Sequence, residues 1–365
     1  MNYNSKTLDE LCDVKIGRTP PRNQSEWFNS GASDDWKWVS IKDMGDCGKF
    51  ITTTSETITD KAKETFNYAT AARGTILLSF KLTLGRVVIC DGEFVTNEAI
   101  AQLPIKDPSI IDRDYLYYYL KNYNWSDIGS TSSIATAVNS KMVKSIKIDF
   151  PDLETQKKTV CILSALDQKI ELNNQESKNL HKIIQTLYRN AATSIKEKTK
   201  LADLAKISSG KRPMSIETNG EYAVVGARDV MGFTNEYNQE PEVIITGRVG
   251  TLGVVKRYQK KTWASDNTLI VDTRYKNYIE CYLSSVDFGS YNRGSTQPLI
   301  TQTDLKNFVL PFDKEKCDSF ENKTASLRNK MFALEEQNED LIMLRDALLP
   351  KLMSGEININ GVCSL

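Results

Sequence analysis

Two long stretches of the chain place apolar residues at alternating steps of three and four, the spacing of one face of a helix. The first begins near Leu153 and includes residues 163–187, where no glycine or proline interrupts the pattern; the second begins near Asp313. A seven-residue apolar repeat sustained over many turns is typical of a coiled-coil seam, because each apolar residue keeps facing a partner helix. The pattern therefore predicts two helices of about 40 residues, each roughly 60 Å long.

The stretches that precede these helices are patterned differently. Residues 75–80 (TILLSF) and 242–247 (EVIITG) are short runs of β-branched and apolar side chains, which predict buried strands. Residues 113–123 (RDYLYYYLKNY) and 277–286 (NYIECYLSSV) predict short helices whose tyrosines belong to the core. Each long helix therefore follows a globule of mixed strands and helices.

The chain also repeats itself. The segment LDELCDVKIGRTP at 8–20 matches LADLAKISSGKRP at 201–213, with Gly17 aligned to Gly210. Four more pairs of segments follow in the same order: 39–45 with 225–232, 83–89 with 251–257, 96–103 with 266–273 (through Asn97 and Asn267), and 129–139 with 294–304. Matches in one order, each series ending in a long helix, indicate two copies of one unit.

We therefore predict a mixed α/β fold: two similar α/β domains separated by a long antiparallel two-helix coiled coil, with pseudo-two-fold symmetry. The alternative is that each long helix only packs on its own globule. The predicted ranges are 1–150 for the first domain, 151–198 for the central spacer helix, 199–312 for the second domain, 313–355 for the C-terminal spacer helix and 356–365 for the tail.

Each predicted seam contains one polar residue, Asn173 in the first helix and Asn338 in the second. An antiparallel alignment that places Asn173 against Asn338 also places Leu180 against Met331 and Leu163 against Leu348. A buried amide without a partner costs roughly 1–3 kcal/mol, so the asparagine pair is expected to fix the register of the helices. The alternative is that both asparagines lie at a solvated edge where other subunits dock.

Composition narrows the classes of function. Lysine plus arginine equal aspartate plus glutamate at 47 each, so any contact with DNA must come from local patches. The single histidine, His181, leaves no histidine-based triad or multi-histidine metal site within the chain. Seven scattered cysteines without C-x-x-C spacing suit reduced thiols in a cytoplasm. No signal-peptide pattern and no apolar run of membrane-spanning length are present.

The sequence carries none of the common catalytic signatures. It has no phosphate-binding G-x-x-x-x-G-K-[ST] loop, no G-x-S-x-G elbow and no [ND]-P-P-[YF] signature of amino-methyltransferases. The segment 151–158 (PDLETQKK) has the wrong spacing for a nuclease motif and opens a helix, where acidic residues complement the helix dipole. Two similar readers about one duplex turn apart are instead the usual geometry for a split DNA site.

In the order of its motifs and in their residues, the chain resembles the specificity subunits of type I restriction–modification systems. The resemblance covers nearly all of it and is carried by GRTP at 17–20, WVSIKDM at 38–44, FPDLETQKKTVCILSALDQKIELNNQ at 150–175 and LRDALLPKLMSGEI at 344–357. The chain is slightly short for that family, and its second globule is the smaller one. The resemblance implies a non-catalytic DNA-binding subunit whose two target recognition domains each read one half of a bipartite, asymmetric site.

The same resemblance implies partners and cofactors. Methylation subunits that use S-adenosylmethionine would dock on this chain, and restriction subunits that use ATP and Mg would join them; no cofactor is expected in the chain itself, and no membrane. Two other classes remain as alternatives, namely a stand-alone restriction or methylation enzyme and a scaffold that does not bind DNA.

DNA contact requires positive side chains for phosphates and bidentate side chains for base edges. Positions that match between the two copies are the first candidates, because both copies should face DNA in the same way. The candidates are Arg18 with Lys211, Lys42 with Arg228, and Asn97 with Asn267, together with Lys81 and Arg86 in the first copy and Arg248, Arg293 and Gln297 in the second.

Overall fold

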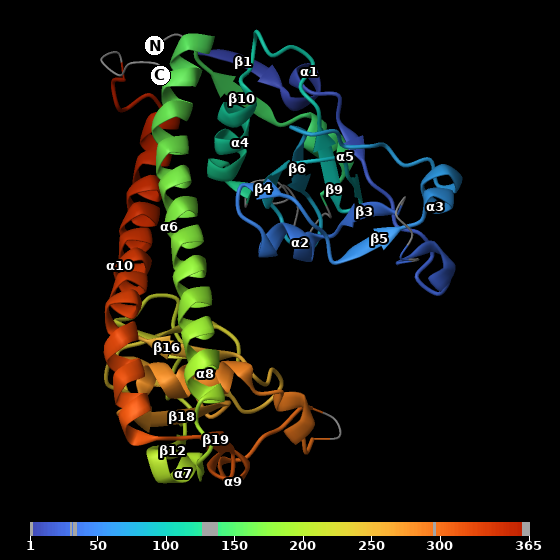
Figure 1. Ribbon diagram of the computed structural model, residues 1–365. Coiled ribbons are helices and arrows are strands. Elements are labelled where there is room, and N and C mark those ends of the chain that lie inside the picture. Colours follow the sequence, from blue (N-terminus) through green and yellow to red (C-terminus); the bar gives the residue numbers. More distant parts are fainter. Residues whose placement is uncertain (1–2, 30, 32–34, 126–137, 295–296, 360–365) are drawn as a thin grey trace. The chain divides into compact units, whose positions relative to one another are not determined.

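The computed structural model describes residues 3–29, 31, 35–125, 138–294 and 297–359. It divides the chain into two compact units (Figure 1). The first unit consists of residues 1–169 and 341–365, and the second of residues 170–340. No helix within the described ranges is long and apolar enough to cross a membrane.

The first unit contains the N-terminal strands and helices, the start of one long helix and, from residue 341 on, the end of the other. Its strands are β1 (Asn4–Thr7), β2 (Lys15–Ile16), β3 (Trp36–Val39), β4 (Phe50–Ile51), β5 (Glu56–Ile58), β6 (Ile76–Ser79), β7 (Val87–Cys90), β8 (Val95–Thr96), β9 (Ile100–Leu103) and β10 (Lys147–Phe150). Its helices are α1 (Leu8–Leu11), η1 (Ser25–Trp27), α2 (Ile41–Asp46), α3 (Asp60–Thr65), α4 (Arg113–Asn122), α5 (Ser140–Lys144) and the first part of α6 (Leu153–Thr193).

The second unit follows the same plan with fewer insertions. Its strands are β11 (Lys198–Lys200), β12 (Ala205–Ser209), β13 (Tyr222–Val225), β14 (Val230–Thr234), β15 (Val243–Gly247), β16 (Val255–Tyr258), β17 (Thr262–Ala264), β18 (Thr268–Thr273) and β19 (Val309–Pro311). Its helices are the rest of α6, α7 (Leu201–Leu204), α8 (Lys276–Ser285), η3 (Phe288–Tyr291), α9 (Gln302–Lys306) and most of α10 (Lys314–Met353).

The sheet topologies confirm the internal repeat. The first unit has a sheet of order β2-β9-β6-β7-β4 and a second of order β5-β3-β8, in which β3 and β8 are parallel. The second unit has β12-β18-β15-β16 and β14-β13-β17, in which β13 and β17 are parallel. An antiparallel pair, β1-β10 or β11-β19, completes each unit. The fold is therefore mixed α/β, with two domains of one topology.

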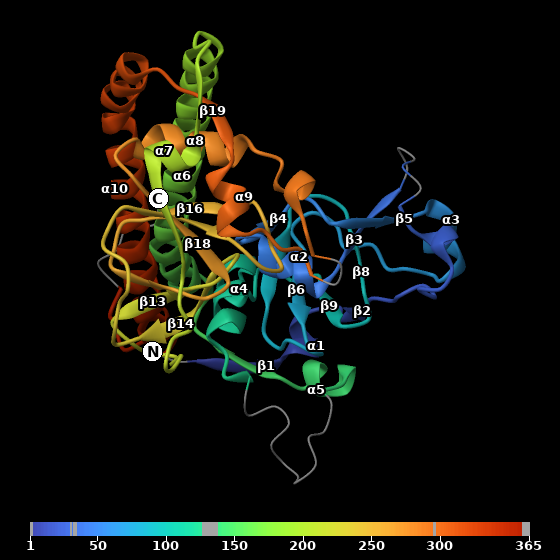
Figure 2. The same ribbon diagram turned by 90° about the horizontal axis from the view of Figure 1, so that it is seen from below.

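The predicted buried strands are β6 and β15, and every residue in both is buried because each sheet has a core on either face. Ile76 and Leu78 of β6 belong to one core cluster, whereas Leu77 belongs to another. In β15, Ile244 and Ile245 divide between two clusters in the same way. A strand covered on both faces reads as a continuous apolar run rather than as an alternation. The predicted short helices are α4 and α8, and α4 lies between α6 and the larger sheet (Figures 1 and 2).

The two long helices run antiparallel in each unit. In the second unit, Asn173 Nδ2 donates to Oδ1 of Asn338 at 2.9 Å, and Lys316 Nζ donates to the carbonyl oxygen of Ser194 at 2.7 Å. In the first unit, Arg345 Nη1 lies 2.9 Å from Oδ1 of Asp167. Low numbers on α6 therefore meet high numbers on α10, as the alignment on the asparagine pair requires.

Asn173 lies inside the interface, whereas Asn338 is half-buried at its edge. Asn173 is 1% exposed, and its amide also donates to Gln337 at 2.8 Å, while Asn338 donates to Asn174 at 2.9 Å. Leu180 and Met331 belong to one core cluster, and so do Leu163 and Leu348, as the alignment predicts. That the pair fixes the register stays a prediction.

The alternating three-and-four spacing that starts at Leu163 also predicts Leu187 at the seam, and this prediction is wrong. Leu187 is 36% exposed, whereas its neighbour Tyr188 is 5% exposed and packs edge-on against Tyr278 and Phe320. The buried face of α6 shifts by one residue near its end because the helix there packs on the second globule as well as on α10. The long helices therefore pair with each other, and each of them also packs on a globule.

The tail does not stand apart from the first unit. Ile359 is buried in the same core cluster as Leu8, and Ile357 packs against that cluster. The predicted segment 356–365 thus belongs to the first unit as far as residue 359, and residues 360–365 lie outside the described residues.

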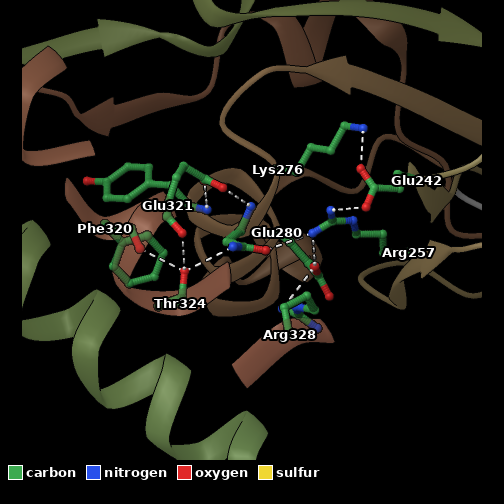
Figure 3. Close-up of polar contacts among 10 residues, drawn as sticks. Glu242, Arg257, Lys276, Glu280, Phe320, Glu321, Thr324 and Arg328 are labelled. Carbon is green, nitrogen blue, oxygen red and sulfur yellow. Dashed lines mark hydrogen bonds and ion pairs between the residues drawn. The ribbon is translucent and has the colours of Figure 1, made fainter. Parts of the chain in front are cut away.

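A buried ionic cluster attaches the second globule to α10. Glu280 of α8 lies between two arginines, with its Oε2 3.0 Å from Nη2 of Arg328 on α10 and 4.0 Å from Nη1 of Arg257 on β16 (Figure 3). Arg257 also lies 3.2 Å from Glu242 and donates to Oδ1 of Asn277 at 2.7 Å. Burial raises the pKa of Glu280, and the two arginines act in the opposite direction.

The backbone N–H groups at the start of helix α8 find their hydrogen-bond acceptor on α10. The N-cap residue, Tyr275, makes no side-chain cap, and Glu321 instead accepts the backbone N–H groups of Asn277 and Tyr278 at 3.2 and 2.8 Å (Figure 3). In the corresponding helix α4, Asp112 caps its own helix. An acceptor for these N–H groups is required at any buried helix start, so α8 depends on α10 for its position.

Candidate nucleic-acid interface

Three loops meet at one end of the larger sheet in the first unit. Gly17 donates its N–H to the carbonyl of Ile100 at 3.2 Å, and Arg18 donates to Thr96 at 2.9 Å. Phe80, at the start of the β6–β7 loop, donates to Ala99 at 2.9 Å. The loops that carry Arg18, Lys81 and Asn97 are therefore held side by side by their backbones.

Helix α2 adds a fourth segment to this end of the sheet (Figure 2). Asn97 donates its N–H to Val39 at 3.1 Å, and Arg86 Nη1 donates to the carbonyl of Ile41 at 2.6 Å. Ser40 caps α2, which places the exposed Lys42 in the first turn of that helix. The five candidates of the first copy thus come from segments bonded to one another.

The second unit builds the same site from equivalent loops. Lys211 donates its N–H to Ala264 at 2.9 Å, and Arg248 donates to Asn267 at 2.8 Å. The loop between η3 and α9 closes over them, because Ile300 donates to Arg248 at 3.0 Å and Arg293 donates to Leu299 at 3.0 Å. Gln297 lies exposed in this loop. A Cβ added to Gly247 would contact the carbonyl oxygen of Ala227, so the turn that carries Arg228 adjoins the same loops.

The candidates differ in what their side chains already contact. The exposed ones are Arg18, Lys42, Lys81, Lys211, Arg228, Arg293 and Gln297, and the half-buried ones are Arg86, Asn97, Arg248 and Asn267. The Arg86 guanidinium already donates a hydrogen bond to the carbonyl of Ile41. Asn97 Oδ1 accepts the N–H of Ala99 at 3.0 Å in a local turn. These two side chains therefore hold loops together, and DNA contact by them stays a prediction.

Two cations of the second copy have acidic neighbours. Arg293 forms an ion pair with Asp304, whose carboxylate also caps α9 through Thr301. Burial acts to raise the pKa of Asp304, but the hydrogen bonds of Thr301 and the charge of Arg293 hold it below its ordinary value. Arg228 lies 3.4 Å from Asp229, with both side chains largely exposed. An exposed pair such as Arg228–Asp229 is weak and leaves Arg228 able to bind a phosphate, whereas the Asp304 carboxylate of the other pair is buried.

The predicted equivalence of Asn97 and Asn267 is wrong by two residues. Asn97 donates its N–H to Val39, and the residue that makes this bond in the second copy is Ser265, which donates to Val225. Asn267 corresponds to Ala99, because the carbonyl of each accepts the N–H of the residue that follows the neighbouring strand. That residue is Phe80 after β6 in the first copy and Arg248 after β15 in the second. The shared asparagine letter misled the alignment, because backbone bonds and not side-chain identity define the turn.

Two tryptophans support the sites and were not singled out from the sequence. Trp38 Nε1 donates to the carbonyl of Arg18 at 3.2 Å, and Trp263 Nε1 donates to the carbonyl of Lys211 at 2.7 Å. They come from strands β3 and β17, which do not correspond in the repeat, so no alignment could have paired them. Each fixes the backbone beside an exposed cation.

Leu82 is also a residue that the sequence reading passed over. It lies at the tip of the β6–β7 loop with φ +61°, and its side chain is 96% exposed. A residue other than glycine in this region costs about 1–3 kcal/mol unless its surroundings impose it. The signal in the sequence was the alignment of TLGR with TLGV, which sets Leu82 against Gly250.

Comparison with known proteins identifies the family. The model of the type I restriction modification DNA specificity domain matches residues 1–182 and again residues 194–313. The two matches cover most of the chain, one for each copy of the repeat. The chain therefore belongs to this family, and it is a DNA sequence-recognition protein of type I restriction–modification.

Particular relatives extend over nearly the whole length. The MjaIX specificity subunit of Methanocaldococcus jannaschii is 23% identical over 98% of this chain and 94% of its own. A putative type I specificity subunit of Mycoplasma genitalium is 22% identical over 96% of this chain and 94% of its own. The crystal structure of a type I S subunit from M. genitalium has the same fold, with a TM-score of 0.56 at 18% identity over 96% of both chains.

Proposed function

We propose that each domain reads one half of a bipartite, asymmetric DNA site through the loops at the end of its larger sheet. The observation that carries the proposal is the repeated construction of this site, in which equivalent backbone bonds present Arg18 in one copy and Lys211 in the other. Exposed cations on braced loops suit phosphate contact, and the different loops around them suit two different base sequences. The unequal domains fit an asymmetric site.

In this proposal the chain carries no catalytic centre and directs its partners. Methylation subunits that use S-adenosylmethionine dock on it, restriction subunits that use ATP and Mg join them, and the assembly works in the cytoplasm. The family of the chain and the lack of the common catalytic signatures in its sequence support this division of work.

Sequencing of methylated bases in the host genome tests the function. Deletion of this gene is expected to abolish one bipartite methylation motif, and its return on a plasmid is expected to restore the same motif. A methylome that is unchanged by the deletion, in a host that expresses the chain, would contradict the proposal. Reconstituted complex that binds duplexes of unrelated sequence equally well would contradict it as well.

Exchange of the second domain separates the two readers. Replacement of residues 199–312 by the matching segment of a relative is expected to change one half of the methylated motif and to leave the other half and the gap unchanged. The reciprocal exchange of residues 1–150 serves as the control and should change the opposite half. A change in both halves after either exchange would show that the domains read the site jointly.

Arg248→Ala is expected to weaken DNA binding by the assembled complex about 3- to 10-fold at moderate salt. The lost phosphate contact should lower the slope of affinity against salt by about one, with little change in sequence preference. Arg274→Ala is the matched control, because it removes the same charge from the opposite end of β18, where Arg274 pairs with Asp318. Equal affinity of wild type and Arg248→Ala would remove Arg248 from the interface.

The asparagine pair is expected to set the gap between half-sites through the register of the helices. Asn338→Leu removes one of the two acceptors of the buried Asn173 amide, and Asn173→Leu removes one partner of Asn338, so each should cost about 0.5–1.5 kcal/mol of unfolding free energy. The double variant should recover that stability but relax the register, so that the methylated motif acquires a second gap length. Single variants as stable as wild type, together with an unchanged gap in the double variant, would disprove this role.

A further inference from the structure

The tip of the β6–β7 loop combines an unfavourable backbone with a fully exposed apolar side chain. Thr83 donates its N–H to the carbonyl of Lys81 at 2.7 Å, which closes a three-residue turn around Leu82 with φ +61°. This form of the γ-turn, with positive φ at its centre, is rare and strained. The Leu82 side chain is 96% exposed.

The second copy shows that the turn itself does not need a leucine. Thr251 donates to Val249 at 3.1 Å around Gly250, which has φ +81° and occupies the same place in the β15–β16 loop. Glycine adopts this conformation without steric cost, whereas leucine does not. The leucine therefore makes the loop conformation less favourable, and its side chain gains almost no stabilising burial in the fold. We take this as a sign that it contacts another molecule.

The loop is braced on both sides. Ser79 Oγ donates to the carbonyl of Thr83 at 2.6 Å, and Gly85 donates its N–H to Ser79 at 3.0 Å. A Cβ added at Gly85 would overlap the ring of Trp125, which thus packs directly on the loop, and Arg86 ties the other side to α2. A side chain held on such a support loses little conformational freedom on binding, which favours its use as a contact group.

The surroundings of Leu82 indicate what it contacts. Its loop lies beside the segments that carry Arg18 and Asn97, and the exposed Lys81 precedes it. A duplex seated on these cations would bring a groove to the tip. Among the groups that the bases present in the grooves of B-DNA, the 5-methyl group of thymine is the apolar one.

We propose that Leu82 contacts the 5-methyl group of a thymine in the half-site that the first domain reads. This rests on the proposed function of the loop cluster as a DNA reader. Leu82 is then a specificity-determining residue for one half-site, and the second domain, with Gly250 at the same place, makes no such contact. The two halves of the site differ in this respect because of one side chain.

The variant Leu82→Gly tests the proposal without threatening the fold. It removes the side chain and places glycine where the second copy already has it, so the midpoint of thermal unfolding should stay equal or rise. Binding of the methylation complex to its own site should fall roughly 5- to 20-fold, as for loss of one base contact. A fall in affinity with a rise in stability cannot be ascribed to misfolding.

Deoxyuridine in place of thymine, one position at a time, identifies the base. One position in the first half-site should weaken wild-type binding about 4-fold, the value for loss of one buried methyl group, and should leave Leu82→Gly unaffected. Replacements in the second half-site should change the affinity of both proteins equally or not at all, which is the internal control. Wild-type affinity in Leu82→Gly, or a weakened variant with no position sensitive to the methyl group, would overturn the proposal.

The two levels of the hypothesis fail differently. If the wild-type complex recognises no bipartite motif, the proposed function itself fails. If it does recognise one but the first half-site contains no A·T pair, or Leu82→Gly binds as wild type does, only the assignment of Leu82 fails.

Discussion

Glu280→Ala is expected to lower the free energy of unfolding by about 3–5 kcal/mol, the usual effect of removing one member of a buried ion pair. The Glu280 side chain is 8% exposed and that of Arg328 is 5% exposed, with 3.0 Å between their charged atoms. Without the carboxylate, the buried Arg328 guanidinium loses its ion-pair partner and retains the electrostatic interactions with Glu321 and Glu335. The loss of unfolding free energy is measured by denaturant titration of the full chain, from the transition in which the second unit unfolds.

A double variant distinguishes the loss of a partner from the loss of packing. Glu280→Leu with Arg328→Met replaces the pair by apolar side chains and should recover most of the stability, because neither charge is then buried. The ring of Phe332, which lies near both arginines, offers an apolar surface for the new methionine. A single variant that costs less than about 1 kcal/mol, or a double variant as unstable as Glu280→Ala, would contradict this account of the cluster.

Gly17→Ala is expected to cost about 1–3 kcal/mol of stability and to abolish recognition of the first half-site. A Cβ at this position would overlap the carbonyl oxygens of Thr96 and Asn97, so the loop that carries Arg18 must move away from β8. That movement breaks the bonds from Gly17 to Ile100 and from Arg18 to Thr96. The measurements are thermal unfolding and methylation of the first half-site.

Gly48→Ala is the matched control in the same domain. No atom lies within 4 Å of a Cβ built there, and the residue has no positive φ, so stability should change by less than about 0.5 kcal/mol and methylation should persist. Gly210→Ala should act on the second half-site as Gly17→Ala acts on the first, since its Cβ would overlap the carbonyl of Ser265. Normal methylation by either loop variant would show that the close approach is not needed for reading.

Local sequence patterns were sufficient to predict the main strands and helices and the internal repeat. The apolar runs around Ile76 and Ile244 predicted β6 and β15, and the heptad spacing predicted α6 and α10. The exposed Leu187 shows where this reasoning stopped, because a helix that packs on two neighbours changes its buried face where the neighbour changes. The pairing of Asn97 with Asn267 failed for a related reason, since a turn is defined by backbone bonds to distant strands.

The sequence predicted several residues of the candidate site but not how their side chains are placed. Arg18 and Lys211 were chosen because they match in the repeat, and both lie exposed on equivalent loops. Arg86 was predicted from its charge and from its nearness in sequence to the matched positions, yet its guanidinium donates to Ile41 and braces a loop. Whether a charged side chain faces solvent or a carbonyl depends on which segment lies opposite, and nothing in the neighbouring sequence states that.

The sequence by itself determined the duplicated α/β plan, the two long helices and the polar pair in their seam, because periodicity and internal similarity are properties of residues close together in the chain. The tertiary structure alone decided that Glu321 caps α8 from another helix and that two non-equivalent tryptophans brace equivalent loops. It also decided that Leu82 stands exposed in a strained turn. These features depend on hydrogen bonds and steric contacts between segments far apart in sequence, which form only when the whole chain has folded.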